Sequence, residues 1–191
     1  MSSQSVIAEN LGHLNGVNVE EVHKLVDAVV DQPELAKSKF RLKNRWINGG
    51  HNQSNVTNFY SASQEIAHTQ NFTLDADEPP ILAGGDRGAN PVEHQLNALA
   101  ACLTTTLVYH ASIRGIVIEE LESELEGDLD LQGFLGLSNN VRRGYENIRV
   151  RIVVKTDAEN IEKLKAFAKL SPVYDVTAKG TNVEVTIERK A

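Results

Sequence analysis

The chain has 191 residues, which is enough for one domain or for one domain with an appendage. Apolar residues make up 41% and charged residues 24%, the ordinary composition of a globular protein. With 19 Lys and Arg against 26 Asp and Glu, the formal net charge of −7 argues against nucleic acid as a partner. The single cysteine, Cys102, excludes an intrachain disulfide and any metal cluster held only by cysteines.

The distribution of charge along the chain predicts neither a signal peptide nor a membrane-spanning helix. Residues 1–16 have no basic segment followed by an apolar core, so we expect no signal peptide and a cytoplasmic location. The longest stretch without Lys, Arg, Asp or Glu is 94–113. It contains His, Gln, Asn, Thr and Ser, which favours a helix buried in protein over one facing lipid. We therefore expect no membrane partner.

The N-terminal third predicts one helix followed by β-structure. Residues 1–36 read as a leader and an amphipathic helix that ends near Asp31, with Asn18 as N-cap and Glu21 as its capping-box partner. Residues 37–191 read as the main domain. Within it, 38–74 predicts three strands, the first two joined at the Asn48-Gly49-Gly50 turn.

The strongest helix signals surround Cys102. Asn90 is a candidate N-cap, Pro91 fits the first helical position, Glu93 completes a capping box and Gly115 fits the C-terminal end. The helix between them is apolar nearly all round, which predicts burial on every side. In a domain of this size, we expect a sheet on one face and a partner chain on the other.

Two alternating strands are predicted at 120–131 and 147–155, with acidic and basic outer faces that favour antiparallel pairing. A helix then runs from Thr156 to about Leu170, ended by Ser171-Pro172, and a last strand follows at 183–187. This order predicts an α+β fold with antiparallel sheets packed on helices.

Cys102 is the main candidate for chemistry. A free Cys in the middle of a helix is often an inert buried residue, and that reading stays open. Gln95, seven residues earlier, lies on the same helical face and is a candidate pocket residue. A mid-helix thiol gains little from the helix dipole, so its activation is expected to come from outside the helix, for example from Arg87 or from the first predicted hairpin. The six His form no metal set, and we expect neither a metal nor a cofactor.

The segment NPVEHQLNALAACLTTTLVYHASIRGI, residues 90–116, resembles the Cys-bearing helix of the OsmC/Ohr family of osmotically inducible and organic hydroperoxide resistance proteins. LEGDLDLQGFLGL (125–137) and SPVYDV (171–176) also resemble OsmC-like members. The resemblance covers about residues 38–190. It implies an intertwined homodimer in which antiparallel sheets pack around long central helices.

The resemblance also implies an activity. In the family, the Cys that Cys102 matches attacks organic hydroperoxides and becomes a sulfenic acid, and a second Cys then resolves it as a disulfide. That second Cys stands in a C-P-V motif, where this chain has Ser171. The peroxidase members carry a Glu directly after Asn-Pro. Here Val92 takes that place and Glu93, the candidate catalytic carboxylate, follows one residue later, about 100° further around the helix.

Three functions therefore stay open. The first is a one-Cys peroxidase in which Cys102 is regenerated by an external thiol reductant. The second is a non-catalytic dimer that binds a small apolar or electrophilic ligand at its interface. The third is a scaffold with an inert buried Cys.

Overall fold

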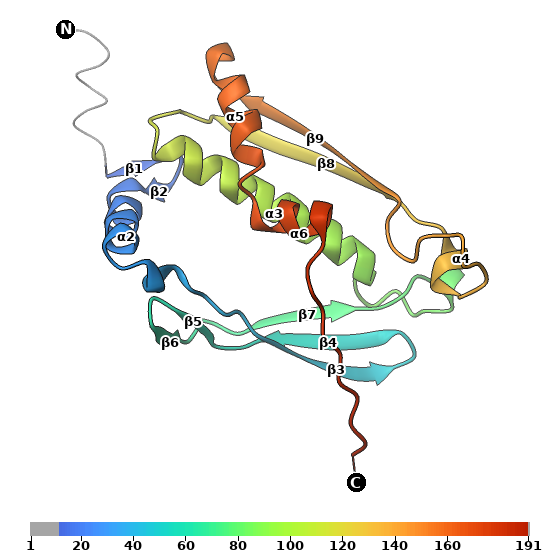
Figure 1. The fold of residues 1–191 in the computed structure, drawn as a ribbon. Helices are drawn as coiled ribbons and strands as arrows, with labels where there is room; N and C mark the ends of the chain where they lie inside the picture. Colours follow the sequence, from blue (N-terminus) through green and yellow to red (C-terminus); the bar gives the residue numbers. More distant parts are fainter. Residues whose placement is uncertain (1–11, 191) are drawn as a thin grey trace, which may run out of the picture. The chain divides into compact units, whose positions relative to one another are not determined.

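The computed structural model describes residues 12–190. The chain divides into two compact units, the first ending at Asn97 and the second beginning at Ala98. The boundary lies within helix α3, which spans Pro91–Ser112. Both units combine helices with small antiparallel sheets (Figure 1), so the predicted α+β class is confirmed.

The first unit opens with a short hairpin and a helix. Strands β1 (His13–Leu14) and β2 (Val17–Asn18) lead directly into α2 (Val19–Asp31). The Asn18 side chain accepts a 3.1 Å hydrogen bond from the backbone N–H of Glu21, as the sequence predicts. This bond satisfies one of the helix's orphan donors and fixes where α2 begins.

A three-stranded antiparallel sheet follows, in the order β3-β4-β7. Its strands are Leu42–Asn48, His51–Val56 and Phe72–Ala76. The strand predicted after the Asn48-Gly49-Gly50 turn is divided at residues 57–58. The part after the division pairs locally as the hairpin β5 (Phe59–Ser61) and β6 (Gln64–Ile66). The predicted turn after β3 is correct: Gly49 takes a φ of 57°, which glycine adopts without strain.

The second unit contains a long two-stranded antiparallel sheet. Strands β8 (Glu120–Asp128) and β9 (Asn147–Lys155) pair along their full lengths. The predicted charge pairing is correct: basic side chains of β9 contact acidic side chains of β8, as in Arg151–Glu124 at 3.2 Å. Because these pairs are mostly exposed to solvent, they add little to stability, and their main effect is to favour this register of the two strands.

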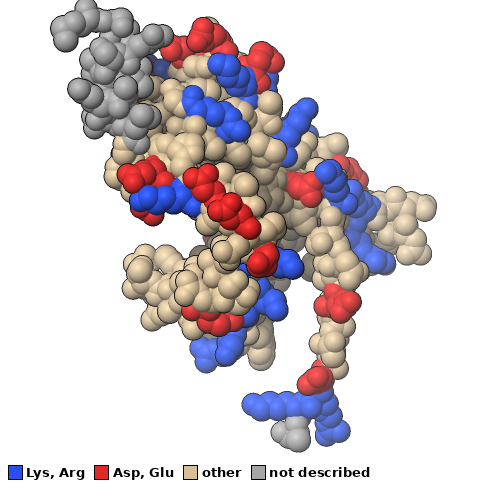
Figure 2. Space-filling view, turned by 60° about the vertical axis from the view of Figure 1, so that its left-hand side comes forward, with Lys and Arg blue, Asp and Glu red and all other residues tan. Residues whose placement is uncertain are grey.

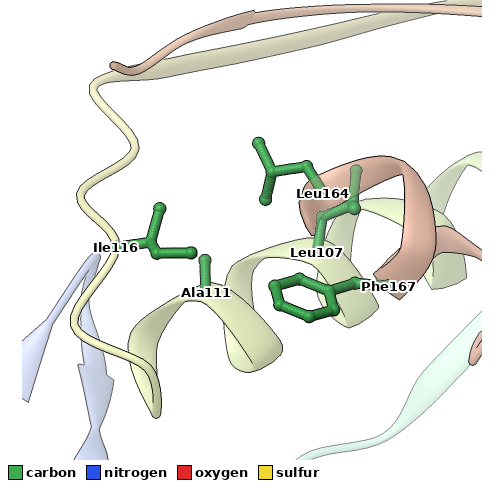
Figure 3. Packing of buried hydrophobic residues seen from close by; sticks show 5 residues of the cluster. All are labelled: Leu107, Ala111, Ile116, Leu164 and Phe167. Atoms are coloured by element: carbon green, nitrogen blue, oxygen red, sulfur yellow. The ribbon is translucent and has the colours of Figure 1, made fainter. Parts of the chain in front are cut away.

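The core of the second unit lies between α3, α5 (Ile161–Ala168) and one face of the β8–β9 sheet. Five buried side chains form it (Figure 3): Leu107, Ala111, Ile116, Leu164 and Phe167. Partly buried residues of both strands pack against them. Between β8 and β9 the chain forms a short helix, α4 (Leu131–Phe134).

Three features differ from the sequence predictions. Helix α6 (Pro172–Lys179) follows directly after Ser171, where the sequence predicted only the end of a helix. Residues 181–190 belong to no strand of the described structure, although a strand was predicted at 183–187. Helix α3 is also not buried on every side, because Tyr109 is 47% exposed. Within residues 12–190, the helices are too short or too polar to cross a bilayer.

Candidate functional site

Cys102 lies in the part of α3 that belongs to the second unit. It is a free thiol, partly buried, and flanked in sequence by the exposed Ala101 and the buried Leu103. The exposed residues around it are small or polar and recur at helical spacing: Ala98, Ala101, Thr105 and Tyr109. Cys102 thus borders a helix face that the single chain leaves uncovered.

Ser171 lies in the same unit and is fully buried, at 0% exposure. It is the N-cap of α6, and its Oγ accepts a 3.2 Å hydrogen bond from the backbone N–H of Tyr174. Pro172 takes the first helical position, where its missing N–H costs nothing. Ser171, which the resemblance to the family places at the resolving position, therefore starts a helix here. The signal was present in the sequence, because Ser followed by Pro is typical of a helix start.

Glu93 lies in the first unit, at the beginning of α3. Its Oε2 accepts a 2.8 Å hydrogen bond from the backbone N–H of Asn90, and Asn90 Oδ1 accepts one of 2.9 Å from that of Val92. The predicted capping box is therefore correct. The Glu93 carboxylate is exposed and has this helix-capping contact, while its catalytic role stays a prediction.

The loop before α3 is organised by a residue that the sequence analysis missed. Asp77 is 2% exposed, and its carboxylate accepts backbone N–H groups from Glu78 at 2.8 Å, Gly85 at 3.2 Å and Arg87 at 3.3 Å. Burial raises the pKa of Asp77, but these backbone hydrogen bonds outweigh it, so the net shift is downward. Nothing in the local sequence separates Asp77 from the other acids of its loop.

Close packing of glycine completes this loop. A Cβ at Gly84 would lie 1.7 Å from the carbonyl oxygen of Glu78, so only glycine fits there. Arg87 follows in the same loop with an exposed side chain, and Gln95 is exposed on α3. Arg87, Glu93 and Gln95 belong to the first unit, while Cys102 and Ser171 belong to the second. The pocket roles of Arg87 and Gln95 stay predictions.

A second polar cluster in the first unit was also missed. His51 Nε2 lies 2.9 Å from Asp75 Oδ1, and Gln53 Nε2 donates to the same oxygen over 3.3 Å. The hydrogen bond to His51 is the main cause of a lowered pKa for the Asp75 carboxyl. His51 and Gln53 are two residues apart in β4, so they lie on the same face of the sheet. Their common partner, Asp75 of β7, can be identified only from the register that pairs Gln53 with Asp75. Among residues 12–190, no three His, Cys, Asp or Glu side chains assemble as a metal site.

The second unit also has an open apolar groove of about 660 Å³. Its lining includes Leu103 and Leu107 of α3 and five consecutive residues of β9, 150–154. Helices α5 and α6 also contribute to the lining, among others with Leu164 and Tyr174. This volume falls within the range of about 300–1,000 Å³ that is typical of ligand pockets.

Comparison of the chain with known proteins identifies a matching family. A family model described as OsmC-like protein matches residues 84–186, which is more than half of the chain. No curated protein matches the chain.

Two solved structures have the same fold at low sequence identity. An OsmC-like protein from Mycoplasma pneumoniae is 17% identical, with a TM-score of 0.55, over 74% of this chain and 88% of that one. An osmotic stress induced and detoxification response protein from Psychrobacter arcticus is 15% identical, with a TM-score of 0.55, over 73% and 88%. At such identities, the likeness concerns the fold.

Proposed function

The chain belongs to the OsmC-like protein family, and from this premise we propose that it reduces organic hydroperoxides through Cys102, in defence against oxidative stress. The observation that carries the proposal is the position of Cys102. It is a partly buried free thiol beside the uncovered face of the helix that resembles the family's reactive helix. A fully buried thiol would be protected from any substrate, and a fully exposed one would lack an apolar surface to orient it.

The proposed reaction uses a single cysteine. The Cys102 thiolate attacks one peroxide oxygen, the O–O bond breaks, and the alkoxide leaves as an alcohol after taking a proton. Cys102 becomes a sulfenic acid. One molecule of an external thiol displaces water to form a mixed disulfide, and a second releases Cys102 as a thiol while it forms a disulfide with the first.

An external reductant is part of the proposal because Cys102 is the only cysteine in the sequence. The hydroxyl of Ser171 cannot form a disulfide, and it already accepts the hydrogen bond that begins α6. A small cytoplasmic dithiol or monothiol would meet this need, because the cytoplasm keeps such thiols reduced.

We propose that the working form is a homodimer in which the uncovered face of α3 meets a second copy. Support comes from the side chains on that face, because Ala98, Ala101 and Thr105 would allow close approach of two helices, and Tyr109 offers a large contact surface. Glu93, Gln95 and Arg87 are proposed to complete the pocket around Cys102.

The test of the reaction is direct oxidation. Reduced protein is treated with stoichiometric cumene hydroperoxide, and dimedone is added to trap sulfenic acid, beside a Cys102→Ser control. The expected result is a dimedone adduct on Cys102 within minutes and consumption of the peroxide when dithiothreitol is supplied. A Cys102 that stays a free thiol throughout would refute the proposal.

The alternative is a non-catalytic dimer that holds a small apolar or electrophilic ligand. The observation in its favour is the Ser at position 171, which removes the family's resolving step. The same experiment separates the two functions. A protein that binds the peroxide without turnover would leave the peroxide concentration unchanged in the presence of dithiothreitol. This would hold even if the bound peroxide protected Cys102 from an alkylating reagent.

A further inference from the structure

The β8–β9 connection, residues 129–146, carries a group of exposed apolar side chains. It lies beyond the ends of the two strands and includes α4 (Figure 1). Four of its large apolar residues are exposed to solvent: Leu131 (39%), Phe134 (67%), Leu135 (59%) and Leu137 (72%). Apolar side chains gathered in one short segment are typical of a surface that meets a protein or a membrane.

The backbone of this connection is fixed by packing. The Asp130 side chain accepts a 2.9 Å hydrogen bond from the backbone N–H of Gln132, which begins α4. Gly133 is buried, and a Cβ there would lie 2.3 Å from the carbonyl oxygen of Arg142, so the two halves of the connection pack backbone to backbone. The exposed apolar side chains are therefore held on a defined scaffold.

Two arginines lie on the returning half of the connection. Arg142 and Arg143 are exposed, and neither forms an ion pair with another residue of 12–190. The arginines of β9 differ, because Arg149 and Arg151 contact acidic side chains of β8. On the face shown in Figure 2, basic side chains likewise lie beside acidic ones over much of the surface. Unpaired positive charge thus lies close in sequence to the apolar side chains, although the chain as a whole carries −7.

The same half of the connection borders an open polar depression of about 540 Å³. Its lining combines two guanidinium groups with a hydroxyl and an amide: Ser138, Asn139, Val141, Arg142, Arg143 and Gly144. None of these lining residues is acidic. Guanidinium groups bind phosphate oxygens with paired hydrogen bonds, and the hydroxyl and amide can donate further ones. The depression therefore suits a phosphate group.

A phosphate site beside exposed apolar side chains matches an anionic phospholipid surface, where phosphates lie next to acyl chains. A soluble phosphate compound would account for the arginines alone, and an apolar protein surface would account for the leucines alone. The expectation of no membrane partner concerned residues 94–113, which are too polar to cross a bilayer. Attachment to the surface of a bilayer needs no spanning helix.

We propose that the β8–β9 connection docks reversibly on anionic phospholipid surfaces. Phe134, Leu135 and Leu137 enter the acyl region, and Arg142 and Arg143 bind lipid phosphates. This inference goes beyond the proposed function and does not depend on the chemistry of Cys102. Docking would bring the protein to the phase into which apolar organic hydroperoxides partition.

The test is co-sedimentation of the purified chain with sucrose-loaded vesicles. One set contains phosphatidylcholine alone, and the other contains phosphatidylcholine mixed with phosphatidylglycerol. We expect binding to the mixed vesicles to be stronger by about tenfold or more, because each arginine near an anionic surface strengthens attachment. Added salt should weaken it by screening these charges. Cys102→Ser should bind like the wild type.

A matched pair of variants checks the apolar side chains. Phe134→Asp/Leu137→Asp should abolish sedimentation with the mixed vesicles. Val30→Asp/Ile81→Asp adds the same charge at exposed apolar positions of the first unit and should retain it. Because all four positions are exposed, both variants should keep the wild-type circular dichroism spectrum.

A second pair checks the arginines. Arg142→Gln/Arg143→Gln should weaken binding to the mixed vesicles by about tenfold. Lys37→Gln/Lys43→Gln removes the same charge from exposed positions of the first unit and should retain most of the binding. A Phe134→Trp variant reports insertion directly, because its added emission should shift to the blue on mixed vesicles.

Each outcome decides the proposal. Failure to sediment with mixed vesicles would overturn it, and so would sedimentation that persists in Phe134→Asp/Leu137→Asp, because the protein would then attach elsewhere. Complete release by inorganic phosphate at constant ionic strength would show that the depression takes a free anion. A change of mass in that variant by light scattering, without vesicle binding by the wild type, would make the connection a contact between copies. All four results leave the proposed reaction of Cys102 intact.

Discussion

The backbone N–H of Tyr174 donates a 3.2 Å hydrogen bond to Ser171 Oγ, and Ser171 is fully buried. This relationship gives a physical role to the residue at the family's resolving position. A serine is a strong N-cap because its oxygen accepts a helix N–H, while a thiol is a weak acceptor. Ser171, which the resemblance places at the resolving position, therefore supplies the start of α6.

We predict that Ser171→Ala destabilises the protein by about 1 kcal/mol, because the backbone N–H of Tyr174 loses the side-chain acceptor that caps α6. The measurement is the free energy of unfolding from urea titrations. Thr181→Ala, at an exposed position after α6, is the control and should change the value by less than about 0.5 kcal/mol. Equal values for the two variants would show that the cap contributes nothing.

We predict that Ser171→Cys restores an intrachain resolving step. Cys102 and residue 171 lie in the same unit, and the resemblance implies that a Cys at this position attacks the sulfenic acid. Treatment with cumene hydroperoxide should give an intact chain that lacks two hydrogens and no longer reacts with dimedone. A Cys102→Ser/Ser171→Cys double variant should show neither change. Persistence of the dimedone adduct in the single variant would contradict the prediction.

The sequence predicts local structure well where the deciding contacts are local. Asn18 with Glu21, and Asn90 with Glu93, are capping pairs three residues apart, and both form as expected. Helix α6 was missed because Pro172 was read as the end of one helix, although it is the first residue of the next. Proline is compatible with both roles, and the buried Ser171 decides between them.

Contacts that depend on distant segments were not predictable. The carboxylate of Asp77 accepts N–H groups from residues up to ten positions away, and only the folded loop brings them together. The helix around Cys102 was predicted to be buried on every side, yet Thr105 and Tyr109 are exposed in the single chain. An apolar pattern predicts that a surface is covered but does not say whether the cover belongs to the same chain.

We predict that Asp77→Asn destabilises the loop before α3 and reduces the dependence of stability on acid. The folded pKa of Asp77 lies below its ordinary value of 3.8, so the folded state binds fewer protons than the unfolded state. The stabilisation by the carboxylate is therefore complete above that value and is lost as the pH falls through the folded pKa. Thermal unfolding from pH 6 down to pH 2 measures it.

The control for this prediction is Asp86→Asn, in the same loop. Asp86 is exposed with a φ of 55°, a conformation that asparagine tolerates, so its substitution should leave stability and acid dependence nearly unchanged. If both variants had the acid dependence of the wild type, the Asp77 carboxylate would not be the anchor of this loop.

We predict that stability also falls as the pH drops below about 6.5, because of His110. Its Nδ1 lies 3.0 Å from the guanidinium of Arg114, so the ring accepts a hydrogen bond and is neutral. The Arg114 guanidinium also lies 4.7 Å from the centre of the Phe167 ring. Desolvation and then the charge of Arg114 lower the pKa of His110 below its ordinary value of 6.5.

The sign follows from proton binding. Between the folded and the unfolded pKa of His110, the unfolded state binds more protons, so the free energy of unfolding rises with pH. The contribution of the neutral His110 ring to stability is fully present above pH 6.5. Urea unfolding at intervals from pH 7.5 to pH 5 should show this rise, and His110→Asn, which keeps an acceptor without titrating, should flatten it. His23→Asn, at an exposed position of α2, is the matched control and should retain the wild-type slope. If His110→Asn kept that slope too, another group would be responsible for it.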